Sequence, residues 1–186
     1  MIILITGAGH TGKTLLAQCL LEKCKYPYLS IDHLKMGLIR SRNIDLTPEN
    51  DIALTDYLWP IVREIIKTAI ENQQNLIVEG CYVPFNWEKD FTGQYLGSIH
   101  FICLAMTSDY IDKHFDEIKA HSSDIENRLG DTDCTIQSLK EDNQKYIKGF
   151  EHRSEQIKII DADYEMTMNS LLKDVCRNID GSYSDM

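Results

Sequence analysis

The chain contains Gly7-Ala8-Gly9-His10-Thr11-Gly12-Lys13-Thr14, a segment that fits the phosphate-binding loop (P-loop) pattern G-x-x-x-x-G-K-T. Glycine at positions 7 and 12 lets the backbone turn through conformations that other residues avoid, and lets it approach an anion closely. Successive N–H groups then converge on one concavity that a phosphate chain fills. We therefore expect residues 7–14 to bind a nucleotide, with Lys13 on the outer phosphates, Thr14 as a ligand of Mg²⁺ and His10 lining the loop.

The residues on either side of this loop have the composition that the pattern requires. Residues 1–6 form a continuous apolar run, which is typical of a buried parallel strand, and residues 14–23 have helical character. The start of that helix would face the anion, where its N–H groups favour negative charge. A glycine turn without a ligand is the alternative interpretation, and the flanking strand and helix disfavour it.

Length and net charge limit the classes of function. With 186 residues, the chain is long enough for a substantial core, and we expect residues 1–186 to form a single domain. A formal net charge of −10 argues against partners such as nucleic acid polymers or anionic membranes, because both attract basic patches. Nucleotides are not excluded, because the local charge at the loop governs their binding.

The cysteines indicate the compartment. Six cysteines and six histidines are scattered along the chain, with no C-x-x-C pair. Most of the cysteines stand in apolar surroundings, which favours reduced structural thiols over disulfides or a metal site. The sequence begins with an apolar strand and lacks an apolar run long enough to cross a bilayer. We therefore expect a cytoplasmic protein, whose oligomeric state the sequence does not indicate.

Apolar runs alternate with helical segments along the chain, which predicts an α/β fold with a parallel sheet wound by crossovers. Further strands are expected at residues 26–31, 75–80, 98–105 and 157–160. Further helices are expected at residues 33–42, 51–73, 109–120, 135–153 and 164–179, with one helical turn near Trp87.

Three segments have special expectations. Pro60 lies inside the predicted helix 51–73 and predicts a kink or a break near Leu58-Trp59. Residues 121–134 are polar and acidic, so we expect a small mobile lid there. Residues 181–186 are expected to form a frayed tail.

Two acidic residues stand at the ends of predicted strands, where open parallel sheets bind their ligands. We expect Glu79 to hold Mg²⁺ through a water, and the alternative is a strand-end acid that accepts bonds from loop amides. We expect Asp32 to accept a proton from a substrate hydroxyl or to orient it. The alternative for Asp32 is capping of the following helix. Tyr82 is expected to wall the acceptor pocket, with core packing as its alternative use.

Arginines supply candidate anion contacts. Arg40 and Arg42 are expected to hold an anionic acceptor by bidentate hydrogen bonds, and a solvated helix face is the alternative. Arg128 is the arginine of the predicted lid, so closure over the γ-phosphate would give it a catalytic role. Its alternative is a surface ion pair with Glu126 or Asp131.

These features resemble the small P-loop kinases related to nucleoside monophosphate kinases. Arg128-x-x-Asp131 followed by Thr135-Ile136 is similar to the lid of adenylate-kinase-like enzymes. The resemblance implies a three-layer fold with a five-stranded parallel sheet in order 2-3-1-4-5, and ATP as the phosphoryl donor. Residues 160–163 resemble the last strand and the loop whose backbone borders the adenine, which implies nucleotide contacts for Asp161 and Ala162 (sequence I-D-A-D).

Departures from adenylate kinases bear on the acceptor. Residues 80–85 lack the arginine that a true adenylate kinase carries after its third strand, and Leu139 and Lys140 stand near the place of its second lid arginine. Both losses argue against AMP as the acceptor. Ser30-Ile31-Asp32 is instead similar to P-loop kinases that phosphorylate hydroxyl groups, including zeta-toxin-like and 2-phosphoglycerate-kinase-like proteins. That similarity implies a base role for Asp32 and a metal-side role for Glu79.

The leading hypothesis is an ATP- and Mg²⁺-dependent phosphotransferase that acts on a hydroxyl group of a small molecule. A nucleoside or nucleoside monophosphate kinase is the first alternative. A non-catalytic adenine-nucleotide-binding regulatory protein is the second. A GTPase is disfavoured because the chain lacks an N-K-x-D motif.

Overall fold

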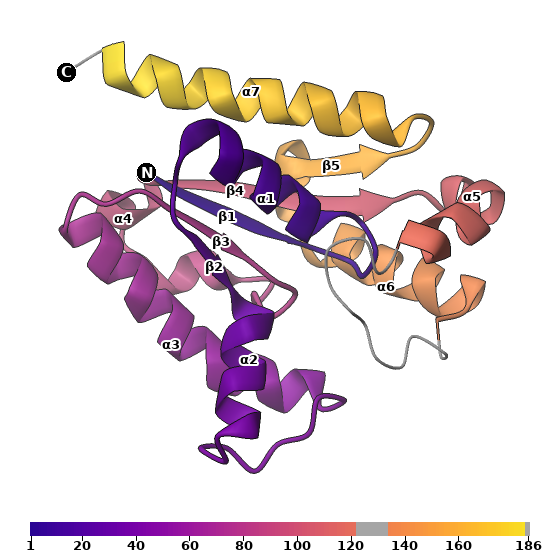
Figure 1. The fold of residues 1–186 in the computed structure, drawn as a ribbon, viewed down its shortest axis with the longest axis horizontal. Helices are drawn as coiled ribbons and strands as arrows, with labels where there is room; N and C mark the ends of the chain where they lie inside the picture. Colours follow the sequence, from indigo (N-terminus) through magenta and orange to yellow (C-terminus); the bar gives the residue numbers. More distant parts are fainter. Residues whose placement is uncertain (122–133, 185–186) are drawn as a thin grey trace.

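The computed structural model describes residues 1–121 and 134–184, and a parallel sheet runs through its centre (Figure 1). The strand order is β2-β3-β1-β4-β5, and each neighbouring pair is parallel. The strands are β1 (Ile2–Gly7), β2 (Tyr28–Ser30), β3 (Leu76–Glu79), β4 (Ile99–Met106) and β5 (Ile157–Ile160). The predicted order 2-3-1-4-5 is confirmed.

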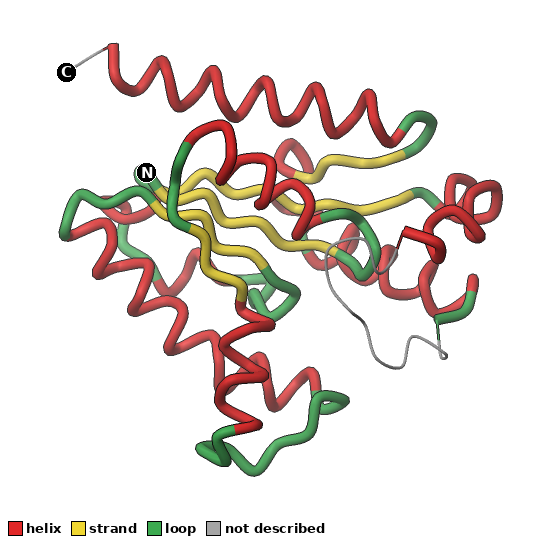
Figure 2. Tube along the Cα trace, in the orientation of Figure 1, coloured by secondary structure: helices red, strands yellow, loops and turns green. Residues whose placement is uncertain are grey.

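Helices cover both faces of this sheet (Figure 2). Helices α1 (Lys13–Cys24) and α7 (Tyr164–Ser184) pack on one face, and α3 (Asp51–Glu71) and α6 (Ile136–Gly149) pack on the other. The remaining helical segments are α2 (Ile31–Arg40), η1 (Trp87–Asp90), α4 (Gly93–Leu96), α5 (Ser108–Ala120) and η4 (Glu151–Gln156). The three layers and the turn at Trp87 match the expectations.

The side chains of β1 explain why its sequence is apolar throughout. Ile2 and Leu4 belong to the core cluster that includes α3, whereas Ile3 and Ile5 belong to the cluster that includes α1 and α7. All four side chains are fully buried. Because helices cover both faces, successive residues of the strand must all be apolar.

The sequence predicted a kink or a break near Leu58-Trp59, and of these two the break does not occur, because α3 continues past Pro60. Leu58, Trp59 and Val62 are buried on the core side, while Pro60 is exposed. A proline ring on the solvent side is tolerated because helices curve with that side outermost. Burial of the opposite face holds the helix together across the missing hydrogen bond.

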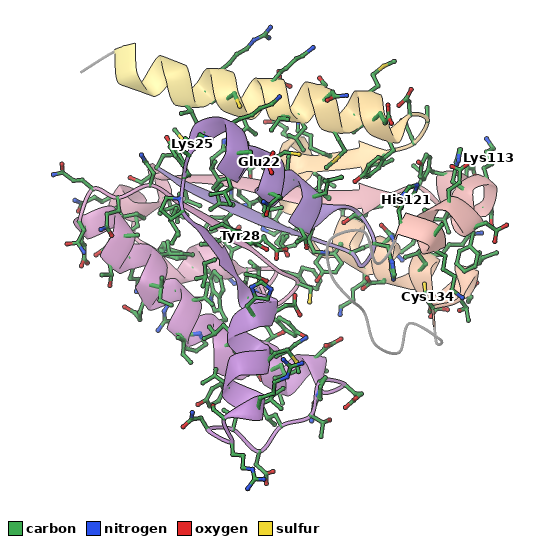
Figure 3. All side chains as sticks on the ribbon, in the orientation of Figure 1. Glu22, Lys25, Tyr28, Lys113, His121 and Cys134 are labelled. Atoms are coloured by element: carbon green, nitrogen blue, oxygen red, sulfur yellow. The ribbon has the colours of Figure 1, made fainter. Side chains whose placement is uncertain are left out.

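Two other boundaries differ from expectation. Strand β2 begins at Tyr28 and ends at Ser30, so it is shorter than the predicted strand 26–31 and Asp32 already lies in the first turn of α2. Helix α7 continues to Ser184, so residues 181–184 of the predicted tail are helical. The predicted lid lies outside the described residues, apart from His121 and Cys134 at its two ends (Figure 3).

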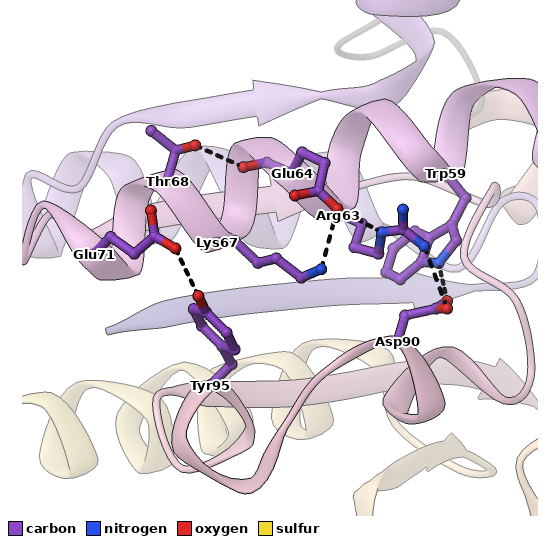
Figure 4. A network of polar contacts seen from close by, with 8 residues as sticks. All are labelled: Trp59, Arg63, Glu64, Lys67, Thr68, Glu71, Asp90 and Tyr95. Carbon is purple, nitrogen blue, oxygen red and sulfur yellow. Dashed lines mark hydrogen bonds and ion pairs between the residues drawn. The ribbon is translucent and has the colours of Figure 1, made fainter.

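Polar contacts fix the segment after β3 to α3 (Figure 4). Asp90 accepts a hydrogen bond from Trp59 Nε1 at 2.7 Å and one from Arg63 Nη1 at 3.3 Å. The Tyr95 hydroxyl donates to Glu71 Oε1 at 2.6 Å. These contacts anchor the chain that leaves the β3 end, where the candidate site lies. Among the described residues, no helix has both the length and the apolar character that a membrane span needs.

Candidate active site

The P-loop connects the end of β1 to the start of α1 and has the backbone of an anion-binding turn. Gly7, His10 and Gly12 all have positive φ, at 139°, 61° and 84°. A Cβ at Gly7 would overlap the backbone of Leu104 on β4, and a Cβ at Gly12 would overlap the Tyr164 hydroxyl. Glycine is therefore required at both positions for conformation and for space.

The loop is organised around the carbonyl of Ala8. The Thr11 hydroxyl donates to this oxygen at 2.8 Å, and Lys13 Nζ donates to it at 2.6 Å. The Ala8 N–H donates to Leu104 O at 3.1 Å, which ties the loop to β4. Lys13 is thus folded back over its own loop, and its ammonium group has further N–H donors for a phosphate.

The start of α1 offers backbone donors at the same place. Among the described residues, no side chain caps this helix, whose N-cap is Gly12. The first N–H groups of a helix have no intrahelical partner and favour anions. Together with Lys13, they form the donor set that a triphosphate requires.

Glu79 lies at the end of β3, in register with Ile5 of β1 and Ser30 of β2. Only 1% of its surface is exposed, and its Oε1 accepts a hydrogen bond from the Tyr28 hydroxyl at 2.8 Å. Burial raises the pKa of Glu79, while the positive charge of Lys13 opposes this shift. The carboxylate is therefore electrostatically coupled to the P-loop lysine.

Asp32 occupies the first turn of α2 and forms an ion pair with Lys35 Nζ at 2.6 Å. The capping alternative for Asp32 is wrong, because Ser30 is the N-cap and its hydroxyl accepts the His33 N–H at 3.4 Å. Lys35 also donates to the Tyr82 hydroxyl at 2.9 Å, and its charge lies 5.0 Å from the centre of that ring.

Tyr82 joins this group to α3. Its ring is buried, and its hydroxyl lies 3.4 Å from Asp51 Oδ1 at the start of α3. Burial first, and then the negative charges nearby, raise the pKa of Tyr82, so it remains a neutral hydrogen-bonding group. Burial likewise raises the pKa of the neighbouring Cys81 thiol to about 11, which excludes a thiolate nucleophile there.

The remaining predicted site residues are exposed or lie outside the described residues. Arg40 and Arg42 are exposed at the far end of α2, and Arg42 has a positive φ of 59°. Asp32 and Arg40 are eight positions apart, which separates them by about 12 Å along a helix. Arg128 lies outside the described residues. Asp161 and Ala162 follow β5 and are exposed.

These residues would suit a magnesium ion that is coordinated partly by the protein and partly by substrate phosphates, rather than by protein side chains alone. Within residues 1–121 and 134–184, no three His, Cys, Asp or Glu side chains come together as a metal site. Mg²⁺ is commonly held by one or two protein ligands together with substrate phosphates and waters. Thr14 beside the loop and Glu79 at the β3 end suit that arrangement.

Sequence patterns missed three residues of this region. Lys35 and Asp51 complete the group around Tyr82, and Asp142 of α6 accepts a hydrogen bond from the Gly9 N–H at 2.7 Å. The i,i+3 spacing of Asp32 and Lys35 was the available signal for the first of them. Asp51 and Asp142 reach the site only through tertiary packing.

Comparisons with known proteins agree with the geometry. No family model matches the chain. A gluconokinase from Sinorhizobium meliloti 1021 superposes with a TM-score of 0.54 at 14% identity, covering 98% of this chain and 95% of that one. A shikimate kinase from Bacteroides thetaiotaomicron gives 0.55 at 13% identity, covering 97% and 98%. A sugar kinase from Janibacter sp. HTCC2649 gives 0.54 at 15% identity, covering 92% of each chain.

The chain has a P-loop kinase fold. A sequence relative adds a second line of similarity: a cytidylate kinase from Methanocorpusculum labreanum is 33% identical over 81 residues. That match covers 43% of this chain and 46% of the relative, so it spans less than half the length of either protein. The superposed kinases share this fold, and their names point to different phosphate acceptors.

Proposed function

We propose that the chain is an ATP-dependent kinase that phosphorylates a hydroxyl group of a small molecule. The observation that carries this proposal is the meeting of three features at one edge of the sheet. The P-loop follows β1, Glu79 ends the neighbouring β3, and Asp32 follows β2 beside it. Phosphoryl transfer requires a phosphate cradle, a place for Mg²⁺ and a positioned acceptor, and these residues provide all three.

In this proposal each of these side chains has a role in phosphoryl transfer. The loop N–H groups and Lys13 bind the β- and γ-phosphates, and Asp32 accepts the proton of the acceptor hydroxyl as its oxygen bonds to the γ-phosphorus and ADP leaves. Lys35 fixes the orientation of Asp32 through the 2.6 Å ion pair. Thr14 and Glu79 would hold Mg²⁺, which supplies charge neutralisation for the phosphates.

We place the reaction in the cytoplasm. The six cysteines are scattered without a C-x-x-C pair and most stand in apolar sequence, which supports a reducing compartment. Arg128 and the backbone of Asp161 and Ala162 are proposed to contact the nucleotide, on the grounds of the lid and last-strand resemblance alone.

A nucleoside or nucleoside monophosphate kinase is the second candidate. The partial match to a cytidylate kinase favours it. The exposed positions of Arg40 and Arg42, away from Asp32, disfavour a monophosphate as the acceptor, because its own phosphate needs cations.

An acceptor panel tests the proposal. Purified protein is given ATP, Mg²⁺ and either polyols, sugars, hydroxy acids, nucleosides or nucleoside monophosphates, and ADP release is followed. We expect release with a hydroxyl compound, and Lys13→Ala should lower it about 100-fold or more. Lys23→Ala, an exposed lysine in the last turn of the same helix, is the matched control.

The other outcomes are distinct. Release only with monophosphates would support the nucleotide kinase. Tight ATP binding with no product from any acceptor would support a regulatory protein.

A further inference from the structure

A carboxylate already occupies the middle of the P-loop. The Gly9 N–H donates to Asp142 Oδ2 at 2.7 Å, across 133 residues of sequence. A Cβ built on Gly9 would lie 3.6 Å from the same oxygen, so the carboxylate rests against the loop backbone itself. This N–H belongs to the turn whose donors converge on a phosphate.

The position of Asp142 is set by its neighbours on α6. Asn143 is buried, and its side chain accepts the Met106 N–H at 2.7 Å and donates to Leu139 O at 2.8 Å. One turn further along, the Tyr146 hydroxyl donates to Cys81 O at 2.8 Å. These contacts tie α6 to the ends of β4 and β3, and they hold Asp142 over the loop.

We propose that Asp142 is an internal anion that competes with phosphate for the P-loop and thereby sets the affinity of the site. One N–H cannot donate fully to a carboxylate and to a phosphate oxygen together. Two negative groups beside one donor also repel each other, and half-burial of Gly9 and Asp142 makes this repulsion stronger than it is in bulk water. A triphosphate therefore binds only after the Asp142 side chain has left Gly9. This inference rests on the proposed nucleotide site and adds a residue that opposes its occupation.

The state of Lys13 is consistent with such competition. Its ammonium group bonds to the Ala8 carbonyl and not to Asp142. The carboxylate and the lysine thus each bond to a backbone group of the loop. A ligand must displace the Asp142 carboxylate from Gly9, whereas Lys13 has other N–H groups that can donate to a phosphate.

Asp142→Asn tests the inference because it removes the charge and keeps the shape. We expect its affinity for pyrophosphate, and for ATP, to rise about tenfold over wild type in calorimetric titrations. Glu141→Gln is the matched control, because Glu141 is exposed on the same helix and its carboxylate accepts from Gln137 instead. Its affinities should stay within about twofold of wild type, as for other exposed charges.

Unchanged or weaker pyrophosphate binding by Asp142→Asn, with normal binding by Glu141→Gln, would overturn the inference. Hydrogen exchange of the Gly9 amide in nucleotide-free wild type gives a second readout that needs no variant. Slow exchange is expected, and exchange at the rate of an open amide would also overturn it. If wild type and both variants bind neither ATP nor pyrophosphate, the proposed function itself fails, and the competition fails with it.

Discussion

At the scale of single residues, Glu79 is the proposed Mg²⁺ residue, and its burial disfavours the charged form of its carboxylate. The carboxylate is buried at the end of β3, and burial raises its pKa above the ordinary value of 4.5. The Tyr28 hydroxyl and the Lys13 charge offset part of that cost. Functional sites often retain such groups at the expense of stability.

Glu79→Gln should therefore stabilise the protein at neutral pH while lowering kinase activity. The folded state holds the proton of Glu79 more tightly than the unfolded state does. Below pH 4.5 both states are protonated, and as pH rises through the folded pKa the wild type loses stability that the glutamine variant keeps. Urea unfolding at neutral pH and below pH 4.5 measures this difference. A variant less stable than wild type at neutral pH would contradict it.

Asp32 should matter for turnover rather than for nucleotide binding. We expect Asp32→Asn to lower kcat about 100-fold, because a positioned base is lost, while the Kd for ATP stays near the wild-type value. Asp56→Asn, an exposed aspartate on α3, is the control. Unchanged turnover in Asp32→Asn would remove the base role.

Lys35 should act through Asp32 and Tyr82. Lys35→Met removes an ion pair and a hydrogen bond from the acceptor side, so we expect kcat to fall about tenfold with little change in ATP affinity. Partial rescue by Lys35→Arg would support a positioning role. Lys89→Met, at an exposed lysine in η1, should leave kcat unchanged.

At the scale of elements, the long helix α3 is destabilised by an internal proline and stabilised by the packing of its buried face. Pro60 removes one backbone hydrogen bond from the exposed side of an otherwise continuous helix. The buried face, with Leu58, Trp59 and Val62, outweighs that loss. This balance explains why α3 has no break at Pro60, one of the two outcomes that the sequence rule for proline predicted.

Pro60→Ala should raise the free energy of unfolding by about 2 kcal/mol. The gain is about 3 kcal/mol from the restored helix position, reduced by up to about 1 kcal/mol because the unfolded chain becomes more flexible. Pro48→Ala, in the exposed turn before α3, lacks the helical gain and should not stabilise. Denaturant unfolding compares the two variants, and equal effects would contradict this account of α3.

Element boundaries also show where sequence patterns reach their limit. The apolar runs of β1 and β4 predicted these strands closely, because strands covered on both faces must be apolar throughout. The end of β2 was predicted less well, since it depends on the Ser30 cap that starts α2 two residues early. Ser30-Ile31-Asp32 shows no hydrophobic periodicity by which a strand could be told from the start of a helix.

At the scale of the whole molecule, parallel topology explains why the grouping of strand-end residues was predictable. The order β2-β3-β1 places three strand ends side by side, so Asp32, Glu79 and the P-loop meet although they are dozens of residues apart. The contacts of Asp51 and Asp142 were not predictable in this way. They depend on how α3 and α6 pack across the sheet edge, and local sequence does not encode that packing.

Binding of ATP by the P-loop is the claim on which the rest depends. Calorimetric titration of ATP with Mg²⁺ into wild type and Lys13→Ala tests it most directly. The account predicts saturable binding by wild type and a large loss of affinity in the variant, whose far-UV circular dichroism should remain that of wild type. Absence of ATP binding by wild type, or equal affinity in both proteins, would contradict it.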